Sequence, residues 1–255
     1  MEQETDKKYI ILENETLEHN GRTLYRIQAI KDFAKVKAGD KGGWVESKNN
    51  LSQKGNCWLY REAKAYDNSD ISGDVEVFGN AEIYGDAQLW GFANIGWDVK
   101  IYDEAKVYGH VMLFDNVEIC NNAMVYGYAE LTHNIKVCDD AYVCEYAYIF
   151  NHVEISGDAY ICGNTHIENY AQISGDVCVS CDERIIGDVK INNCDDYLVF
   201  RIGKPSHYVT YIKQNKKWIT GTFDGTTEEI LKHEKSYNEK GYKQLKEYIK
   251  IMDLL

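Results

Sequence analysis

Histidine is the residue type in this chain best suited to acid–base catalysis, because an imidazole titrates near neutral pH. Four of the seven histidines, His110, His133, His152 and His166, lie in the central part of the 255-residue sequence. A histidine base also needs a second group that orients its ring. His110, in the stretch "VYGHV", is the best candidate for a catalytic base. Corner and surface positions without chemistry are the alternative for all four.

Carboxylates and aromatic rings recur at a fixed spacing along the central segment. The carboxylates are Asp86, Glu104, Asp140, Asp158 and Asp176, and the two aromatic rows are Trp90, Tyr108 and Tyr126, and Tyr66, Tyr84 and Tyr102. Regularly spaced carboxylates on a rod can imitate the phosphates of a nucleic acid, or they can form a solvated acidic edge. Stacked aromatic rows suit an interface, either within a homotrimer or with another protein. Both sets are therefore candidates for partner binding.

The eight cysteines give a weaker chemical signal. Cys120 and Cys138 are separated by the same spacing as the aromatic rows, and so are Cys144 and Cys162. Each pair could therefore come within disulfide distance on adjacent turns. We expect free thiols, because nothing in the sequence indicates secretion. The CxxC at 178–181 has no second pair at zinc-ribbon spacing, so no metal site is expected.

The elements that must position these side chains repeat every six residues, as in "VEVFGNAEIYGDAQLW" at 75–90. The phase runs unbroken from 51 to 194, which is 24 hexads. Between 63 and 194 one position is Ile, Val or Leu in 21 of 22 hexads, and a small or β-branched residue stands two positions earlier except at Glu183. Two positions after the aliphatic residue, Gly, Asn, Asp or His follows in 19 of 22 hexads. These four types tolerate the positive φ of a sharp corner.

Each hexad therefore predicts one short strand and one corner, with inward and outward residues alternating. Three hexads close a triangular 18-residue coil, and residues 51–194 predict about eight coils with no extruded loop. On one face the outward residues alternate in charge, beginning Lys64, Glu82, Lys100 and Glu118, which would pair opposite charges between coils. The predicted fold is an all-β solenoid, a parallel β-helix of hexapeptide repeats.

The flanking segments are expected to cap the solenoid, since an open sheet edge would promote aggregation. Residues 1–50 predict an N-terminal β cap with strands near 9–12 and 23–28. Residues 195–255 predict a small C-terminal ββαα unit, made of a hairpin over 207–223, a helix after a Thr226–Glu229 capping box and a second helix over about 239–252.

The distribution of charge limits the possible partners. The net charge is −13, and residues 51–194 contribute −15, from 23 acids against 8 bases. This segment is unsuited to gripping a nucleic-acid backbone, which requires Lys and Arg, and suits a protein partner with a basic surface. The sequence has no membrane-length apolar run, and its start, "MEQETDKKYI", lacks a secretory signal. We therefore expect a cytoplasmic protein without membrane contact.

The hexads resemble the left-handed β-helix of hexapeptide-repeat acyltransferases, which implies a left-handed coil. In that family a histidine base lies at a subunit interface near an acyl-CoA groove, often formed by a loop that interrupts the hexads. The stretch "YRIQAIKDFAKVKAGDKGGWVESKNNLSQKGNCWLY" (25–60) resembles the YdcK-like acyltransferases and related phage-encoded β-helix proteins. The stretch "GTFDGTTEEILKHEKS" resembles a small domain that recurs in phage proteins.

These features lead to three functional hypotheses. The first is a non-catalytic, phage-encoded protein that acts in the host cytoplasm. It would inhibit a host factor, such as a nucleic-acid-handling defence enzyme, through its acidic surface and C-terminal unit. The second is a trimeric acyltransferase that uses acyl-CoA, and the third is a purely structural β-helix. The unbroken hexads favour the first hypothesis, for which no catalytic residue and no cofactor are expected.

Overall fold

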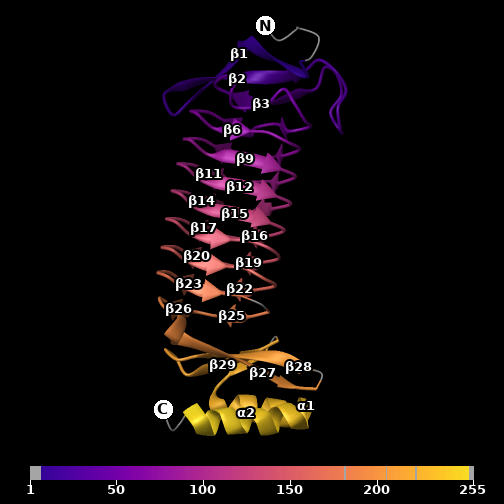
Figure 1. Cartoon of the computed structure of the whole chain (residues 1–255). Helices are drawn as coiled ribbons and strands as arrows, with labels where there is room; N and C mark the ends of the chain where they lie inside the picture. The colour runs from indigo at the N-terminus through magenta and orange to yellow at the C-terminus, as the bar shows by residue number, and fades with distance from the viewer. Residues whose placement is uncertain (1–6, 181, 205, 222, 253–255) are drawn as a thin grey trace.

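The computed structural model describes residues 7–180, 182–204, 206–221 and 223–252. The chain forms a long triangular solenoid of about eight coils, with the N-terminal segment at one end and two helices at the other (Figure 1). Three parallel sheets form its walls, which we call faces 1, 2 and 3 in the order in which the chain visits them from Lys64 onward. The predicted all-β solenoid of hexapeptide repeats is confirmed.

The strands of the walls are short because each hexad has only a few extended residues. Face 1 contains β5 (Lys64–Ala65), β8 (Glu82–Ile83), β11 (Lys100–Ile101), β14 (Val117–Ile119), β17 (Ile135–Val137), β20 (Glu154–Ile155), β23 (Gln172–Ile173) and β26 (Lys190–Ile191). Face 2 contains β6 (Asp70–Ile71), β9 (Gln88–Gly91), β12 (Lys106–Gly109), β15 (Met124–Gly127), β18 (Tyr142–Val143), β21 (Tyr160–Ile161) and β24 (Cys178–Val179). Face 3 contains β4 (Trp58–Leu59), β7 (Glu76–Val77), β10 (Asn94–Ile95), β13 (Met112–Phe114), β16 (Glu130–Thr132), β19 (Tyr148–Phe150), β22 (His166–Glu168) and β25 (Arg184–Ile186).

Neighbouring coils are in register at a spacing of three hexads, so equivalent side chains lie above one another. Lys100, for example, pairs with Glu82 on one side and Glu118 on the other. The same offset holds along all three faces from Trp58 onward, which confirms that no loop interrupts the coils. The first turn differs, because Leu51 bridges to Ile71 rather than to Ser69, where the regular spacing would place its partner. The regular register therefore begins at Trp58 rather than at Leu51.

The corners take the conformation that their residue types predict. Every described corner residue of the hexads from Asp67 to Gly187 has a positive φ. Trp97 and Glu145 also do so, at 59° and 58°, although neither residue type favours this conformation. At Gly109 a side chain is excluded as well, since a Cβ would lie 2.7 Å from the Gly127 carbonyl oxygen of the next coil.

The inward residues form one continuous apolar core that runs the length of the solenoid. Glu183 is the exception in both pattern and structure, and it lies in the last coil. The Tyr197 hydroxyl from the following strand donates to Glu183 Oε2 at 2.9 Å, and the Ser180 amide donates to the same oxygen at 3.3 Å. Burial raises the pKa of the Glu183 carboxyl. This inward carboxyl therefore ends the apolar column where the C-terminal unit begins.

The N-terminal segment extends face 1 with three strands, β1 (Tyr9–His19), β2 (Arg22–Ala29) and β3 (Lys41–Val45). The expected capping strands are thus present. Beside them the buried Lys8 ammonium donates to the carbonyl oxygens of Cys57 at 2.8 Å and Gly55 at 3.2 Å. These bonds satisfy carbonyl groups that the end of the solenoid would otherwise leave without a donor.

The C-terminal unit covers the other end with a four-stranded antiparallel sheet and two helices. Its elements are β27 (Tyr197–Gly203), β28 (Ser206–Ile212), β29 (Lys217–Thr220), β30 (Phe223–Gly225), α1 (Thr227–Tyr237) and α2 (Glu239–Met252). The predicted hairpin is β28–β29, the Thr226–Glu229 capping box precedes α1, and α2 has the expected bounds. The sheet has two strands more than that hairpin, because β27 and β30 add to its two sides.

Candidate interaction surfaces

Aromatic rings line the corner between faces 2 and 3. Trp90, Tyr108 and Tyr126 stand just before the corner glycines, in β9, β12 and β15, and pair in register. Their ring centroids are 4.4 and 4.9 Å apart, with interplanar angles of 3° and 5°. The row predicted from the 18-residue spacing is therefore a stack of parallel rings.

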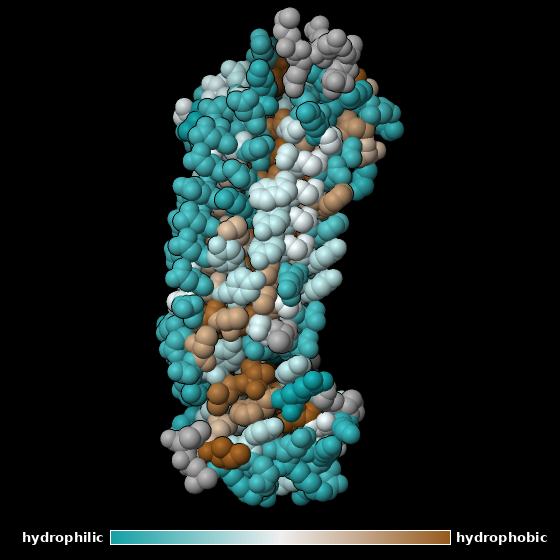
Figure 2. Space-filling model, viewed as in Figure 1, coloured by the Kyte–Doolittle hydropathy of each residue, from teal (hydrophilic) through white to brown (hydrophobic). Residues whose placement is uncertain are grey.

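A second file, which was not predicted, runs along the other side of the same glycines. It consists of Phe92, His110, Tyr128 and Tyr146, with successive centroids 4.7, 4.9 and 5.1 Å apart. Phe92, Tyr128 and Tyr146 are 52, 51 and 59% exposed. The 18-residue spacing that revealed the first file would also have revealed this one. We call the two files together the aromatic ridge. In Figure 2 a pale strip of intermediate hydropathy follows the solenoid.

His110, the candidate base, is a member of this ridge. Its ring lies between those of Phe92 and Tyr128, at interplanar angles of 4° and 2°. Within the described part of the chain no hydrogen bond reaches either ring nitrogen. The group that would orient a catalytic imidazole would therefore have to come from a ligand or from another molecule.

An acidic edge follows the corner between faces 1 and 2. The predicted carboxylates Asp86, Glu104, Asp140, Asp158 and Asp176 are all exposed and stand in one column. Asp86 and Asp140 each accept a hydrogen bond at 2.9 Å from the asparagine of the preceding coil. Glu104, Asp158 and Asp176 accept no side-chain hydrogen bond among the described residues. These three are the most available to a partner.

Three further acids, which sequence reasoning missed, occupy the corner positions of this edge. Asp67, Asp103 and Asp139 accept backbone amide protons of the next coil, from Gly85 at 3.2 Å, Asn121 at 3.1 Å and Gly157 at 3.0 Å. They stabilise the corners by joining successive coils. The edge therefore contains structural carboxylates and solvent-facing carboxylates side by side.

Face 1 carries the predicted charge ladder and the third aromatic row. Lys64 Nζ lies 3.6 Å from Glu82 Oε1. Burial acts to raise the pKa of Glu82, but hydrogen bonds from His19 and Tyr66 and the charge of Lys64 outweigh it, so the pKa is lowered. Tyr66, Tyr84 and Tyr102 stack at 5.0 and 4.9 Å. These contacts stabilise the fold and attach the N-terminal cap.

The structure describes seven of the eight cysteines that were considered as thiol or metal sites. Among the cysteines that the structure describes, Cys120, Cys138 and Cys144 are free thiols with buried side chains. Cys181 lies outside the described residues, so the CxxC is not tested. Across the described ranges no cluster of three or more His, Cys, Asp or Glu side chains could hold a metal. None of the described helices has the length and apolar character of a membrane span.

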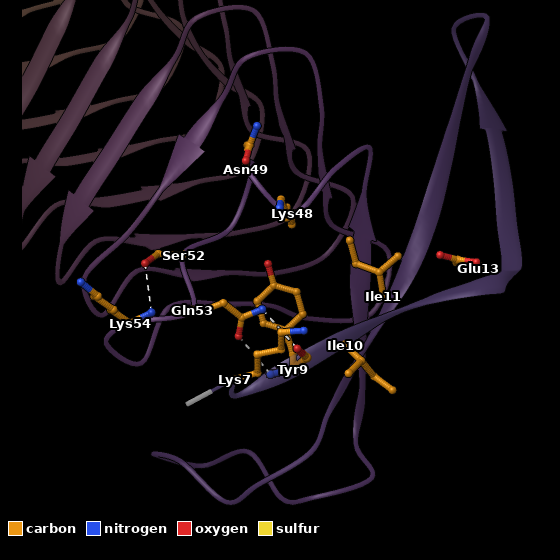
Figure 3. A pocket seen from close by; sticks show the side chains of 10 residues that line it. All are labelled: Lys7, Tyr9, Ile10, Ile11, Glu13, Lys48, Asn49, Ser52, Gln53 and Lys54. Carbon is orange, nitrogen blue, oxygen red and sulfur yellow. Dashed lines mark hydrogen bonds between the residues drawn. The ribbon is translucent and has the colours of Figure 1, made fainter. Parts of the chain in front are cut away.

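A wide cavity of about 830 Å³ opens at the N-terminal cap, between β1 and the loop that includes Lys48 and Lys54 (Figure 3). Gln53 fixes its floor, because its Oε1 accepts the Lys8 amide at 2.9 Å and its Nε2 donates to the Tyr9 carbonyl at 3.1 Å. Lys7, Lys48 and Lys54 are exposed on its rim. These three lysines outnumber Glu13, the acid in the lining, so the rim of this cavity is basic, in contrast to the acidic solenoid.

The comparisons with known proteins agree with the fold but match only a short part of the chain. No protein-family model matches the chain. The chain is 44% identical over 55 residues to the uncharacterized acetyltransferase YdcK of Escherichia coli (strain K12). The match covers 21% of this chain and 17% of that protein. Together with the 18-residue register of three parallel sheets, this similarity makes the chain a β-helix protein of hexapeptide repeats.

Proposed function

We propose that this chain is a non-catalytic interaction protein that presents the aromatic ridge to protein surfaces. The observation that supports this proposal is the ridge itself, whose seven rings stack in two files on an open edge. Contiguous exposed apolar strips on folded proteins mark interaction sites, and aromatic side chains are enriched at the centres of interfaces. Stacking also holds the rings in place before a partner arrives, which lowers the entropic cost of binding.

The first partner that we propose is the chain itself, as a homotrimer with the solenoids side by side. The 18-residue register makes the ridge straight, so copies can touch along several coils. Light scattering should then return about three times the monomer mass of 29.3 kDa. Tyr146→Asp should lower this mass, because a carboxylate would be buried in the interface.

Tyr170→Asp is the matched control for this experiment. Tyr170 and Tyr146 are both 59% exposed, and both stack on the ring one coil earlier. Tyr170 lies after the corner between faces 3 and 1, away from the ridge. A wild-type mass equal to the monomer value at micromolar concentration, or equal effects of the two variants, would contradict the trimer.

The second partner that we propose is a host protein with a basic surface, bound and inhibited through the acidic edge. The resemblance to phage-encoded proteins supports the phage origin, and the exposed Glu104, Asp158 and Asp176 carboxylates support the charge preference. The variant Glu104→Gln/Asp158→Asn/Asp176→Asn should weaken capture of the partner from host lysate and flatten its salt dependence, because charge pairing is screened within about 8 Å at physiological ionic strength.

A charge swap on face 1 controls for a disturbance of charged side chains outside the acidic edge in this capture experiment. Lys136 and Glu154 pair in register and are both exposed, so exchanging them keeps the net charge and leaves the acidic edge intact. Unchanged affinity and salt dependence in the triple variant would rule out recognition through the edge. The C-terminal unit would then become the leading candidate for host-factor binding.

An acyltransferase that uses acyl-CoA is the second candidate function, favoured by the 55-residue similarity to a protein named as an acetyltransferase. His110 would be its base. Calorimetry with acetyl-CoA tests this function directly, with His110→Ala as the variant. Micromolar binding together with acetyl transfer that His110→Ala abolishes would replace the interaction proposal. Absence of both would leave the acyltransferase without support.

A further inference from the structure

A second cavity, of about 660 Å³, lies on face 3 near the N-terminal cap and has aromatic walls. Its walls include Tyr60, Phe78, Trp97 and Phe114, and its floor includes the buried Gly96. Pockets that hold small molecules are typically about 300–1,000 Å³ and combine apolar walls with a few polar groups. The size and composition of this cavity therefore match those of a small-molecule site.

The cavity exists because one ring is missing from an aromatic file. Residues 60, 78, 96 and 114 occupy one outward column on face 3, and only position 96 is glycine. Tyr60 and Phe78 stack at 4.7 Å with an interplanar angle of 10°. A Cβ at Gly96 would lie 2.8 Å from Phe114 Cδ1 and 4.0 Å from Phe78 Cβ. The Phe114 ring therefore leans over the vacant position instead of continuing the stack.

The vacancy has the dimensions of one ring. Successive coils are about 4.8 Å apart, which is also the spacing of stacked rings on this solenoid. One planar ring can therefore enter above Gly96 if Phe114 rotates back into the column. In its present position Phe114 makes an edge contact with Trp97 at 5.2 Å and 76° and covers Gly96. Rotation would exchange these two contacts for stacking on the ring that enters.

Trp97 forms the outer wall in a strained conformation. Its φ is +59° and its side chain is 57% exposed. A positive φ is unusual for a bulky residue, and strain of this kind concentrates at ligand and active sites. The other corners of the same column from Gly79 to Gly187 are filled by Gly, Asp, His or Asn. A tryptophan at this corner therefore strains the backbone and places a large ring at the mouth of the cavity.

The polar groups at the mouth favour an anion. Glu76 is neutralised, because it lies 3.4 Å from Lys35 Nζ and accepts a hydrogen bond from the Tyr60 hydroxyl at 3.0 Å. Arg61 is exposed and forms no ion pair with any residue that the structure describes. Arg61 is thus the uncompensated charge of the site, although the surrounding segment is strongly acidic.

We propose that this cavity binds a planar aromatic ligand that carries an anionic group. The ring stacks between Phe78 and Phe114 above Gly96, with Trp97 against its edge. The anionic group lies at the mouth and pairs with Arg61. This site is separate from the aromatic ridge and from the acidic edge, so it does not depend on the proposed function.

Calorimetric titration of the full chain tests the proposal, because Trp97 is one of five tryptophans and the indole probes share its fluorescence. The anionic probes are AMP and indole-3-acetate, and the neutral probes are adenosine and indole. At least one anionic probe should bind, and should bind more tightly than its neutral counterpart. Failure of both anionic probes to bind at millimolar concentration would overturn the proposal. Equal affinities of charged and neutral probes would overturn the role of Arg61.

Two variants locate the binding. Gly96→Phe supplies the missing ring. A Cβ at this position would crowd the ring end of Phe114, at 2.8 and 2.9 Å, and its three nearest atoms include no backbone atom, so the fold should persist. It should weaken binding of the anionic probe by at least about tenfold, as expected for the loss of one stacked ring. Arg61→Gln should weaken the anionic probe about fivefold and leave the neutral probe unchanged. A folded Gly96→Phe protein with wild-type affinity would place the probe elsewhere and overturn the proposal.

Discussion

The solenoid and the C-terminal unit bury their side chains in different ways. In the solenoid the inward residues form one long column, which Tyr197, Ile212 and Ile219 of the C-terminal unit extend. In the C-terminal unit a separate cluster of Ile202, Val209, Trp218, Ile230 and Leu245 joins the sheet to the helices. The unit also buries a carboxylate, since Glu234 is fully buried beside His207 Nε2 at 3.0 Å.

This difference shows where each region has freedom to vary. All coils have the same kind of inward side chains, so they differ from one another mainly in their outward side chains. The C-terminal unit has no repeat, and its stability depends on a few particular contacts between distant segments. A substitution in the solenoid should therefore destabilise the neighbouring coils, whereas the same substitution in the C-terminal unit should destabilise only that unit.

Truncating a core leucine should give the largest effect in either region. Leu113 and Leu245 are both fully buried, and each Leu→Ala change should lower the free energy of unfolding by about 2–5 kcal/mol. Leu113→Ala should raise amide exchange in the neighbouring coils, because coils are stabilised by their neighbours. Leu245→Ala should raise exchange only from β27 to α2. Equal spreading of the two effects would remove the distinction between the regions.

Adding one methyl group to a glycine should give the next largest effect. Gly109→Ala places a Cβ 2.7 Å from a backbone oxygen at a φ of +89°, whereas Gly221→Ala meets nothing within 4 Å at a φ of +52°. The solenoid variant should lose about 2–3 kcal/mol and the control about 1 kcal/mol. Chemical denaturation would measure both. A smaller loss at Gly109 would mean that the corners can deform.

The boundary between the two regions should respond to pH through Glu183. Burial raises the pKa of this carboxyl from its ordinary value of 4.5. The unfolded chain therefore releases its proton at a lower pH than the folded chain does, and stability falls as the pH rises above about 4.5. Glu183→Gln keeps an acceptor for Tyr197 and removes this loss. Its melting temperature should exceed that of the wild type at pH 7, and the gap should close near pH 4.

The smallest effect is expected on the charge ladder of face 1. Lys136 lies in register between Glu118 and Glu154, and Glu118 is the main cause of its raised pKa. Lys136→Gln should cost at most about 1 kcal/mol, and less in high salt because the Lys136 side chain is exposed. Lys243→Gln in α2, which removes a helical pair with Glu239, should have a still smaller effect. A larger loss for the helix variant would reverse this order.

The repeat determines how much of this structure was predictable. Inward residues, corners and stacking partners follow from the period of one coil, and residues such as His133 and Asp140 lie where that period places them. The left-handedness of the coil does not follow from the repeat. It is implied only by the resemblance to hexapeptide-repeat acyltransferases. The lean of Phe114 over Gly96 depends on a side-chain rotation that the spacing does not specify. Strands β27 and β30 pair with segments that lack a repeat, so their partners could not be predicted from the sequence.

The unbroken register also makes this rod a molecule whose length can change in whole steps. Removing or duplicating any three consecutive hexads within the regular coils would restore the same inward phase, the same corners and the same outward columns. Genetic duplication or loss of such a segment would thus alter reach by one coil while both end pieces still fit. Each such change would leave a chain that still folds, so the gene can vary in length by one coil at a time. Natural variation in size should therefore come in multiples of one coil.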